Sequence, residues 1–492
     1  MRCLALADAL HGQGCNCIFV CRELTESLAA LVESRGHVVR MLGRAKGNNT
    51  GNLTHSSWLG ATQEVDAVQT REALQDELVN WLIVDHYAID WHWQRAMRDL
   101  AGHILVIDDL ADRTHDCDVL LDQNFHPDEP ARYRQEVPDH CHVLLGPRYA
   151  LLREEFRHVR AGVGPRNGDV QRLLVFLGGA DADDLTTAAL QALTLLARSD
   201  LHVDVVIGAA QPNREVIANL CKERGYALHV QTSRMAQLMG QADLAVGAGG
   251  SATWERCSVG LPSLTIAVAQ NQLALVRNAA LHGLIYAPTL ESCEPVALAR
   301  HLQGLLENPN LLAAMSRNGW RLVDGLGVQR VLRAMGVSRL VLRHATADDD
   351  RIVFDWRNHP SVRAVSRSQE PLDWESHCAW FRRVLGDSNR PLLIGTIDGL
   401  PVGVVRFDIS GDRAEVSIYK DPDRDRPGVG ADLLAAGERW LRRHRGDVRF
   451  VDAEVAGFNS ASHRLFDGAG YRISMSQYSK KLHDDVSQST TH

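Results

Sequence analysis

The stretch with the clearest chemical meaning is ADLAVGAGGSATWERCSVG, residues 242–260. An apolar strand runs into a glycine-rich turn, and Ser251 or Thr253 then begins a helix. Glycines let a ligand approach the backbone closely, and the first N–H groups of a helix attract an anion because they have no partners within the helix. The carboxylate of Glu255, on the first helical turn, can accept hydrogen bonds from a sugar diol. We therefore predict an anion site at Gly250 and Ser251.

A second glycine turn, Gly178–Gly179, ends the apolar strand that precedes it. Parallel strands end at one edge of a sheet, so the amides of this turn can serve the same anion. Each feature alone has a simpler explanation, because glycines also make tight turns and Glu255 also complements a helix dipole. Two such turns at neighbouring strand ends favour nucleotide binding.

Short β-branched runs alternate with helical patterns over the first two thirds of the chain, which predicts an α/β fold with parallel sheets. The polar segment Val159–Val170, with three glycines and a proline, predicts a hinge. We expect two Rossmann-like domains, 1–158 on the sugar side and 171–335 on the nucleotide side. The predicted strands are residues 17–21, 37–42, 81–87, 103–110, 118–124 and 142–146, then 172–179, 202–208, 244–250 and 263–268.

From about Arg339 the pattern changes to α+β, and we expect a third domain over 338–481 and a disordered tail over 482–492. The turn DRPGVG (425–430) precedes a long helical pattern and can hold a phosphate at that helix N-terminus. The segment NSAS (459–462) begins another helix. A plain turn and a helix cap explain each piece separately, but their order and spacing favour one ligand site.

Composition excludes several classes of protein. A net charge of −8 gives no electrostatic reason to expect binding to nucleic acid or to an anionic membrane. No apolar run reaches the roughly 18 residues that span a bilayer, and the N-terminus lacks the layout of a signal peptide. The ten cysteines form no CxxC pair, so we expect no metal site and thiols in a reducing cytoplasm. The sequence leaves the oligomeric state open.

Several motifs, kept in order over about residues 1–330, resemble the UDP-sugar hydrolases of pseudaminic acid biosynthesis. Those enzymes have a two-domain GT-B fold and remove UDP from UDP-2,4-diacetamido-2,4,6-trideoxy-β-L-altrose, so the resemblance implies a UDP-sugar substrate. The motifs are VDHYAID (84–90), VIDDLADRTHDCDVLLDQN (106–124), GPRYALLREEF (146–156), FLGGAD (176–181) and GAGGSATWERCSVGLPSLTIAVAQNQ (247–272).

The resemblance also implies roles for individual residues. Tyr87 faces the sugar from the first domain and Asn271 faces it from the second, and both are taken as catalytic. Glu255 binds the ribose hydroxyls. The residues implied at the diphosphate are Gly178, Gly179, Gly250 and Ser251. For four polar residues at strand ends, the sequence does not decide between a role in the site and a structural role. They are Asp85, His86, Asp108 and Asp109.

The resemblance raises one difficulty at the start of the sequence. In the hydrolase family a strand and a loop ending Gly-x-Gly-His precede the segment that matches MRCLALADAL (1–10), and that histidine is the proposed general base. None of the 22 histidines stands in a matching position. We expect the first strand of the sheet to be missing and the true start to lie upstream, with an inactive hydrolase half as the alternative.

The third domain resembles the GCN5-related N-acetyltransferase (GNAT) superfamily, which implies acetyl-CoA as cofactor. Gly428 and Gly430 match the glycines of its pyrophosphate signature, although Asp425 stands where that signature has Gln or Arg. Backbone N–H groups near Ile418 to Lys420 can supply the oxyanion contact at the thioester. The other residues implied at acetyl-CoA are Arg426, Val429, Asn459 and Ser462. Phe466 replaces the usual tyrosine acid, which leaves Glu415, His377, Tyr471 and Tyr478 as candidates for proton transfer.

The opening LRHATADDDRIVFDWRNHPSVR (342–363) looks like the amino-sugar and ribosomal-protein branch of that superfamily. In the pseudaminic pathway such an enzyme acetylates the 4-amino group immediately before UDP is removed. We therefore predict a bifunctional enzyme, an N-acetyltransferase fused to a UDP-sugar hydrolase. The alternatives are a GT-B glycosyltransferase, or a UDP-sugar binding half that serves an active acetyltransferase.

Overall fold

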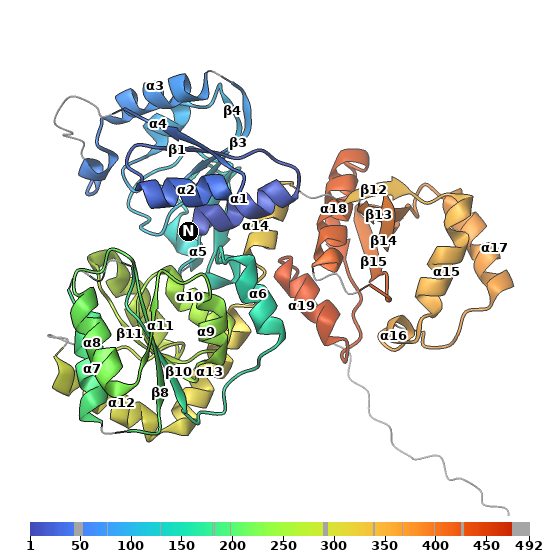
Figure 1. Ribbon diagram of the computed structural model, residues 1–492. Coiled ribbons are helices and arrows are strands. Elements are labelled where there is room, and N and C mark those ends of the chain that lie inside the picture. The colour runs from blue at the N-terminus through green and yellow to red at the C-terminus, as the bar shows by residue number, and fades with distance from the viewer. Residues whose placement is uncertain are drawn as a thin grey trace, which may run out of the picture. The chain divides into compact units, whose positions relative to one another are not determined.

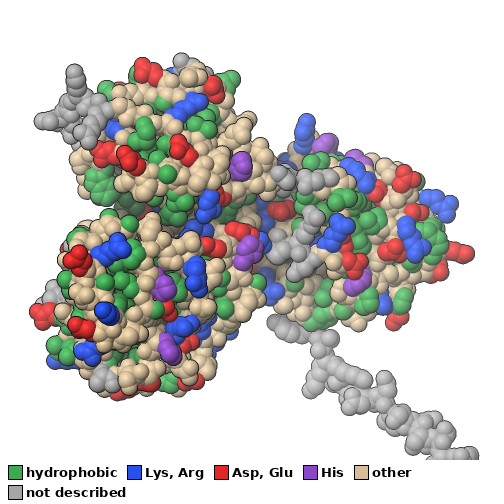
Figure 2. Space-filling view, viewed as in Figure 1, with side chains coloured by type: hydrophobic (Ala, Val, Ile, Leu, Met, Phe, Trp, Pro, Cys, Tyr) green, Lys and Arg blue, Asp and Glu red, His purple; other side chains and the backbone are tan. Residues whose placement is uncertain are grey.

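The computed structural model describes residues 1–43, 53–75, 77–127, 129–179, 181, 183–196, 198–288, 294–337, 340–366, 368–397, 399–424 and 428–474. The chain divides into two compact units, Met1–Val337 and Ser338–His492 (Figure 1). Lys and Arg side chains are interspersed with Asp and Glu on the visible face of each unit (Figure 2), as the small net charge leads one to expect. No helix in the described ranges is both long and apolar enough to cross a lipid bilayer.

The first lobe of unit 1 has two separate parallel sheets, β1–β2 and β3–β4–β5–β6. The helix α1 (Arg2–Gly12) precedes them, and its apolar face packs into a core with β4 and β5. Thr25 and Thr62 cap the next two α-helices, because each hydroxyl accepts a backbone N–H of the first turn. The elements are β1 (Ile18–Cys21), α2 (Glu26–Ser34), β2 (Val38–Met41), η1 (Ser56–Leu59), α3 (Gln63–Leu74), β3 (Val79–Val84), α4 (Trp91–Ala96), β4 (Ala101–Ile107), β5 (Val119–Asp122), α5 (Glu129–Arg132), β6 (His142–Leu145), η2 (Pro147–Tyr149) and α6 (Glu154–Ala161).

The second lobe is one five-stranded parallel sheet with strand order β11-β10-β7-β8-β9. Helices α7, α8 and α12 cover one face, and α9 and α10 lie on the other (Figure 1). The elements are β7 (Arg172–Phe176), α7 (Leu185–Leu195), β8 (His202–Ile207), α8 (Arg214–Arg224), β9 (Ala227–Val230), α9 (Met235–Gln241), β10 (Leu244–Ala248), α10 (Ser251–Ser258), β11 (Ser263–Ile266), η3 (Gln270–Gln272), α11 (Leu273–Leu281), α12 (Pro295–Leu306) and α13 (Pro309–Leu322).

The last helix of unit 1, α14 (Gly327–Ala334), returns to the first lobe. Its Val328 and Val331 share a core with Leu6 and Leu10 of α1. Gly327 fits only without a side chain, since a Cβ there would lie 2.2 Å from the carbonyl oxygen of Ala150. The two α/β lobes are therefore connected at two places, by the segment that follows α6 and by α14. The first connection begins after the end of α6, which is later in the sequence than the hinge predicted to begin at Val159.

Unit 2 contains a five-stranded sheet of order β12-β13-β14-β15-β16, antiparallel except for the pair β15–β16. The helix α18 covers one face, while α15 and α17 cover the other. The elements are β12 (Val341–His344), η4 (Ala347–Asp349), α15 (Asp350–Asn358), α16 (Pro360–Arg363), α17 (Trp374–Leu385), β13 (Leu392–Ile397), β14 (Leu400–Ser410), β15 (Arg413–Lys420), α18 (Val429–His444), β16 (Phe450–Asp452) and α19 (Ser460–Gly468).

Candidate functional sites

The glycine turn after β10 leads directly into α10. Gly250 is the N-cap, with a φ of +91° that favours glycine, and no side chain caps this helix. At Gly249 a Cβ would lie 2.7 Å from Val276 and 2.9 Å from the Gln272 side chain. The first N–H groups of α10 and its positive dipole end therefore face the carboxyl edge of the sheet, as an anion site requires.

A buried arginine lies directly behind this turn. Arg256 is 1% exposed, and its Nη2 donates to the carbonyl of Ala248 and to the hydroxyls of Thr253 and Thr265. Its Nε and Nη1 are buried, and neither has a hydrogen-bond partner in the part of the chain that the structure describes. Burial lowers the pKa of the guanidinium to about 10. A cation behind the turn adds to the attraction that the α10 N-terminus exerts on an anion. Sequence analysis did not identify this residue.

The second glycine turn lies beside the first, because β7 and β10 are neighbouring parallel strands. The strand β7 ends at Phe176, three residues before its predicted end at Gly179. Gly178 has a φ of +104°, which is not compatible with a β-strand. The carboxylate of Asp181 accepts the backbone N–H groups of Leu185 and Thr186. The N-terminus of α7 is therefore already capped, whereas that of α10 is not.

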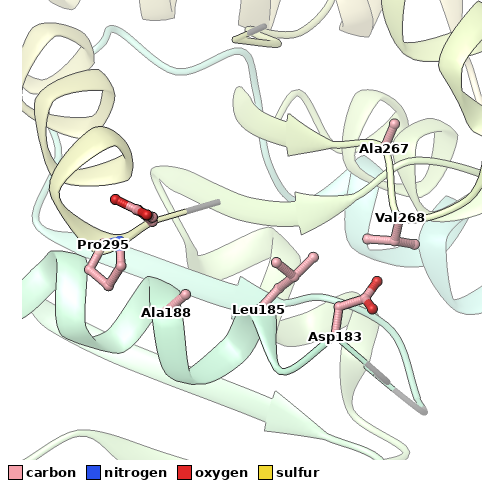
Figure 3. A pocket seen from close by; sticks show the side chains of 7 residues that line it. Asp183, Leu185, Ala188, Ala267, Val268 and Pro295 are labelled. Atoms are coloured by element: carbon pink, nitrogen blue, oxygen red, sulfur yellow. The ribbon is translucent and has the colours of Figure 1, made fainter. Parts of the chain in front are cut away.

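A pocket of about 460 Å³ opens between α7, the end of β11 and the start of α12. In Figure 3, Asp183 and Leu185 point toward the pocket from one side and Val268 from the other. Its volume suits a small organic ligand. The lining residues are Asp183, Leu185, Ala188, Ala267, Val268, Glu294 and Pro295.

The predicted diol ligand Glu255 is half-buried and faces the first lobe. Its Oε1 lies 3.4 Å from Nη2 of Arg153, a residue that also forms an ion pair with Glu155 at 2.6 Å. Burial raises the pKa of Glu255, and the charge of Arg153 opposes that shift. Arg153 precedes α6, and no local sequence signal indicated this contact.

The structure brings the two predicted catalytic residues together across the lobes. The side chain of Asn271, in η3, hydrogen-bonds with the hydroxyl of Tyr87, which follows β3. That hydroxyl donates to Oδ1 of Asp109 at 2.7 Å. Asn124 donates to the other oxygen of Asp109 at 2.9 Å and accepts from Nε1 of Trp254 in α10. A hydrogen-bonded chain thus links Tyr87 to the helix that carries the anion site.

The four polar residues left open have different surroundings. Asp85 forms a two-point ion pair with Arg2, whose Nη1 also lies 3.6 Å from Asp109, so one arginine lies between the two carboxylates, and Asp109 contacts Tyr87. Burial raises the pKa of Asp109. Asp108 is buried, pairs with Arg113 at 2.8 Å and accepts the backbone N–H groups that follow it, which is a structural arrangement.

His86 connects two loops of the first lobe. Its Nδ1 accepts the backbone N–H of Ala88, and the ring also hydrogen-bonds with the backbone of Trp58. Burial lowers the pKa of His86. These contacts describe a neutral ring that holds η1 against the end of β3.

In unit 2, the strand β15, which lies between β14 and β16 in the sheet, separates from β16 after three residues. The pairing runs from Arg413 to Glu415 and stops, so the rest of β15 has no strand on that side in the described residues. The hairpin before β15 has Gly411 (φ +60°) in a two-residue turn, which makes Ser410 and Arg413 a hydrogen-bonded pair. Because N–H directions alternate along a strand, the amide of Ile418 points into the opening.

The sequence matches two family models. Residues 172–323 match the glycosyltransferase family 28 C-terminal domain, and residues 339–472 match the acetyltransferase (GNAT) domain. The chain joins a glycosyltransferase-like unit to a GNAT acetyltransferase domain. The fold predicted from the sequence, a GT-B-like pair of lobes followed by a GNAT domain, is confirmed.

Two curated relatives match the glycosyltransferase-like unit. The spore coat polysaccharide biosynthesis protein SpsG of Bacillus subtilis (strain 168) is 30% identical over 203 residues, 41% of this chain. The UDP-2,4-diacetamido-2,4,6-trideoxy-beta-L-altropyranose hydrolase of Campylobacter jejuni is 27% identical over 172 residues, 35% of this chain. The chain spans 60% of the length of each. Among solved structures, MurG of Acinetobacter baumannii is 16% identical, with a TM-score of 0.45, over 68% of this chain and 95% of its own.

GNAT acetyltransferase domains use acetyl-CoA, so the predicted cofactor is confirmed. The residues present fit such a ligand. Gly428 is the N-cap of α18 with a φ of +89°, and a Cβ on Gly430 would lie 3.8 Å from Leu465 of α19, so the first turn is open to a close approach. Asn459 accepts the N–H of Ser462 as a helix cap and donates to the carbonyl of Val365. Arg426 lies outside the described residues.

The candidates for proton transfer in the GNAT domain differ in surroundings. His377 is buried among aromatic rings and hydrogen-bonds with the carbonyl of Asp350, and burial lowers its pKa. These are the surroundings of a residue that packs the core. Tyr471 donates to Glu438 at 2.9 Å, while Glu415 is exposed on β15. Tyr478 lies outside the described residues. Sequence analysis missed Tyr419, next to Ile418, whose pKa burial raises.

Within the described ranges, no group of three or more His, Cys, Asp or Glu side chains could hold a metal ion.

Proposed function

We propose that the protein is a bifunctional nucleotide-sugar enzyme. Its GNAT domain acetylates the 4-amino group of a UDP-amino sugar, and its glycosyltransferase-like unit removes UDP from the product, UDP-2,4-diacetamido-2,4,6-trideoxy-β-L-altrose. The observation that carries this proposal is the α10 N-terminus, backed by the buried Arg256, in the lobe that matches the family 28 domain. The activity for which the Campylobacter relative is named supports the substrate.

In the proposed complex the N-terminus of α10 binds the diphosphate and Glu255 takes the ribose hydroxyls. The half-open pocket beside α7 receives the nucleobase. Fixed donors at the diphosphate stabilise charge that develops on the leaving UDP, which is the electrostatic help that displacement at an anomeric carbon needs. Tyr87 and Asn271 hold the sugar from opposite lobes. Water attacks C1 with inversion, the C1–O bond to UDP breaks so that UDP leaves with the bonding electron pair, and the proton of the attacking water passes to solvent.

A second candidate for the glycosyltransferase-like unit is UDP-sugar binding without hydrolysis. Both oxygens of Asp109, the carboxylate beside Tyr87, already accept hydrogen bonds, one from Tyr87 and one from Asn124. A general base must have an oxygen or nitrogen within reach of the attacking water. This engagement of Asp109 favours a binding unit that presents substrate to the acetyltransferase.

For acetyl transfer, acetyl-CoA supplies an activated acyl group as a thioester. The amide of Ile418 points into the opening of the sheet, where it can donate to the thioester oxygen as negative charge develops there. Arg357 of α15 supports an anionic acceptor, because among the described residues its buried Nη1 has no hydrogen-bond partner and its Nη2 meets only the carbonyl of Ser368, at 3.3 Å.

The test is to mix the full chain with acetyl-CoA and a UDP-4-amino sugar and to follow free CoA and free UDP separately. Release of both supports the bifunctional enzyme. Release of CoA alone supports the binding unit beside an active acetyltransferase. If neither appears, the proposal fails for both units.

A further inference from the structure

Three aromatic rings form a cluster on the first lobe beside Tyr87. The ring of His55 lies 4.5 Å from that of Trp58 and 5.4 Å from that of Tyr87, and the rings of Trp58 and Tyr87 are 5.9 Å apart. We call these three residues the aromatic cluster. Only Tyr87 of the three was implied by the resemblance, and no role in the proposed chemistry has so far been given to the other two.

Trp58 is exposed although the residues around it are anchored. Its side chain is 59% exposed, whereas Ser56 and Leu59 of the same short helix are buried in the lobe. Leu59 joins the core beneath β3 and β4. A large exposed aromatic side chain on a firmly held segment is typical of a binding surface, because it forgoes the free energy that burial would provide.

The backbone of this segment is fixed from below. The ring of His86 hydrogen-bonds with the backbone of Trp58, and Gly60 ends the short helix with a φ of +66°. At Gly60 a Cβ would lie 3.0 Å from the side chain of Arg22, so this close approach also holds η1 in place. The orientation of Trp58 is therefore set by the fold and does not depend on a ligand.

The cluster adjoins the inter-lobe site through Tyr87, whose hydroxyl meets Asp109 and Asn271 while its ring meets the other two rings. A ligand that reaches the Tyr87 hydroxyl can also reach an aromatic face. The C–H groups on one face of a pyranose carry partial positive charge and pack well on the negative face of an aromatic ring. Ligand sites commonly combine such apolar walls with a few polar groups.

We propose that the aromatic cluster is the sugar subsite of the glycosyltransferase-like unit, with Trp58 stacking on the apolar face of the hexose of a nucleotide sugar. His86 is a positioning residue that acts through the Trp58 backbone. This inference rests on the proposed binding of a UDP-sugar. It states in addition which surface of the protein recognises each part of that ligand. The α10 N-terminus binds the diphosphate, and the aromatic cluster distinguishes the sugar from bare UDP.

The experiment compares two ligands by calorimetric titration of the full chain. One is UDP, and the other is a non-hydrolysable analogue of UDP-2,4-diacetamido-2,4,6-trideoxy-β-L-altrose, with a methylene group in place of the oxygen on C1, because the proposed enzyme would hydrolyse the natural UDP-sugar during the titration. For Trp58→Ala we expect affinity for the UDP-sugar to fall by roughly three- to tenfold and affinity for UDP to stay unchanged. Trp58→Phe, which keeps an aromatic face, should recover most of the loss. Trp91→Ala is the matched control, since Trp91 of α4 contacts only His92 and Arg95 among described aromatic and cationic groups.

Equal weakening of both ligands in Trp58→Ala would show a structural role and overturn the inference, and so would unchanged affinity for both. If the wild-type chain binds neither ligand, the proposed function of this unit has failed, which is a separate result. Equal affinity of the wild type for UDP and for the UDP-sugar would also overturn the inference, because the subsite would then add nothing.

Discussion

Gly247 lies so close to Arg256 that a Cβ at position 247 would come within 2.5 Å of Nη1 of the guanidinium. The arginine cannot easily withdraw, because its Nη2 is held by three oxygens in a fully buried position. The glycine in the strand and the arginine in the helix are thus one packing unit beneath the anion site.

This relationship predicts the effect of Gly247→Ala. The methyl group must displace Arg256, so we expect the free energy of unfolding to fall by about 1–3 kcal/mol and UDP affinity to fall with it. Urea denaturation and calorimetric titration measure the two effects. Gly304→Ala is the control, because nothing lies within 4 Å of a Cβ there, and it should stabilise α12 by roughly 0.5–1 kcal/mol. Unchanged stability and affinity in Gly247→Ala would contradict the packing.

A pH-dependent effect follows from Asp122, which is 1% exposed. Burial raises the pKa of this carboxyl to about 7 from an ordinary 3.8. Between those values the folded state binds more protons than the unfolded state, so this group makes the free energy of unfolding fall as pH rises from about 4 to about 7. In Asp122→Asn that contribution is absent.

We therefore expect Asp122→Asn to gain stability relative to wild type as pH increases through this window. Urea denaturation of both proteins at about pH 5 and about pH 8 measures the difference, and the other titrating groups cancel in the comparison. Parallel stability curves for the two proteins would contradict the raised pKa.

The contact between Tyr87 and Asn271 predicts energetic coupling between the lobes. A double-mutant cycle with Tyr87→Phe and Asn271→Ala, read as affinity for the non-hydrolysable UDP-sugar analogue, should give a coupling energy of about 0.5–1.5 kcal/mol. Asn318→Ala removes an exposed amide of the same lobe as Asn271, which among the described residues donates only to the carbonyl of Gly283, and it should show no coupling to Tyr87→Phe. Strictly additive effects of the first pair would mean that the contact has no role in ligand binding.

The amide of Ile418 predicts a specific loss of acetyl transfer. Ile418→Pro removes the N–H that points into the opening beside β15, and proline is tolerated at an unpaired strand edge. We expect kcat for acetyl transfer to fall by roughly 100-fold, while acetyl-CoA still binds. Ile418→Val keeps the N–H and should retain most of the activity. An unchanged kcat in the proline variant would place the oxyanion donor elsewhere.

Sequence patterns predicted most of the elements in their order and a start of α10 at Ser251 or Thr253, of which the structure has Ser251, because a glycine run between an apolar strand and a helical pattern has few other structures. They missed the strand β9, since Ala227–Val230 is short and only half-buried. The sequence could not show which of the adjacent residues Asp108 and Asp109 is structural and which contacts the candidate site. Their roles differ because the fold gives them different partners, Arg113 for Asp108 and Tyr87 with Asn124 for Asp109.

Long-range charge pairing explains the other misses. Arg153 meets Glu255 from more than a hundred residues away in the sequence, and Arg2 meets Asp85 from across the lobe. Neither contact has a local pattern that would reveal it. The prediction that Tyr87 and Asn271 face the sugar from opposite lobes came from the family resemblance, and the structure brings the two side chains within hydrogen-bonding range of each other.

The most direct test of the central claim is a crystal structure of the full chain with UDP. We expect the diphosphate on the backbone N–H groups at the start of α10, in front of Arg256, with the ribose hydroxyls on Glu255. A diphosphate bound at another place, or no bound UDP at a saturating concentration, would contradict the account of the glycosyltransferase-like unit.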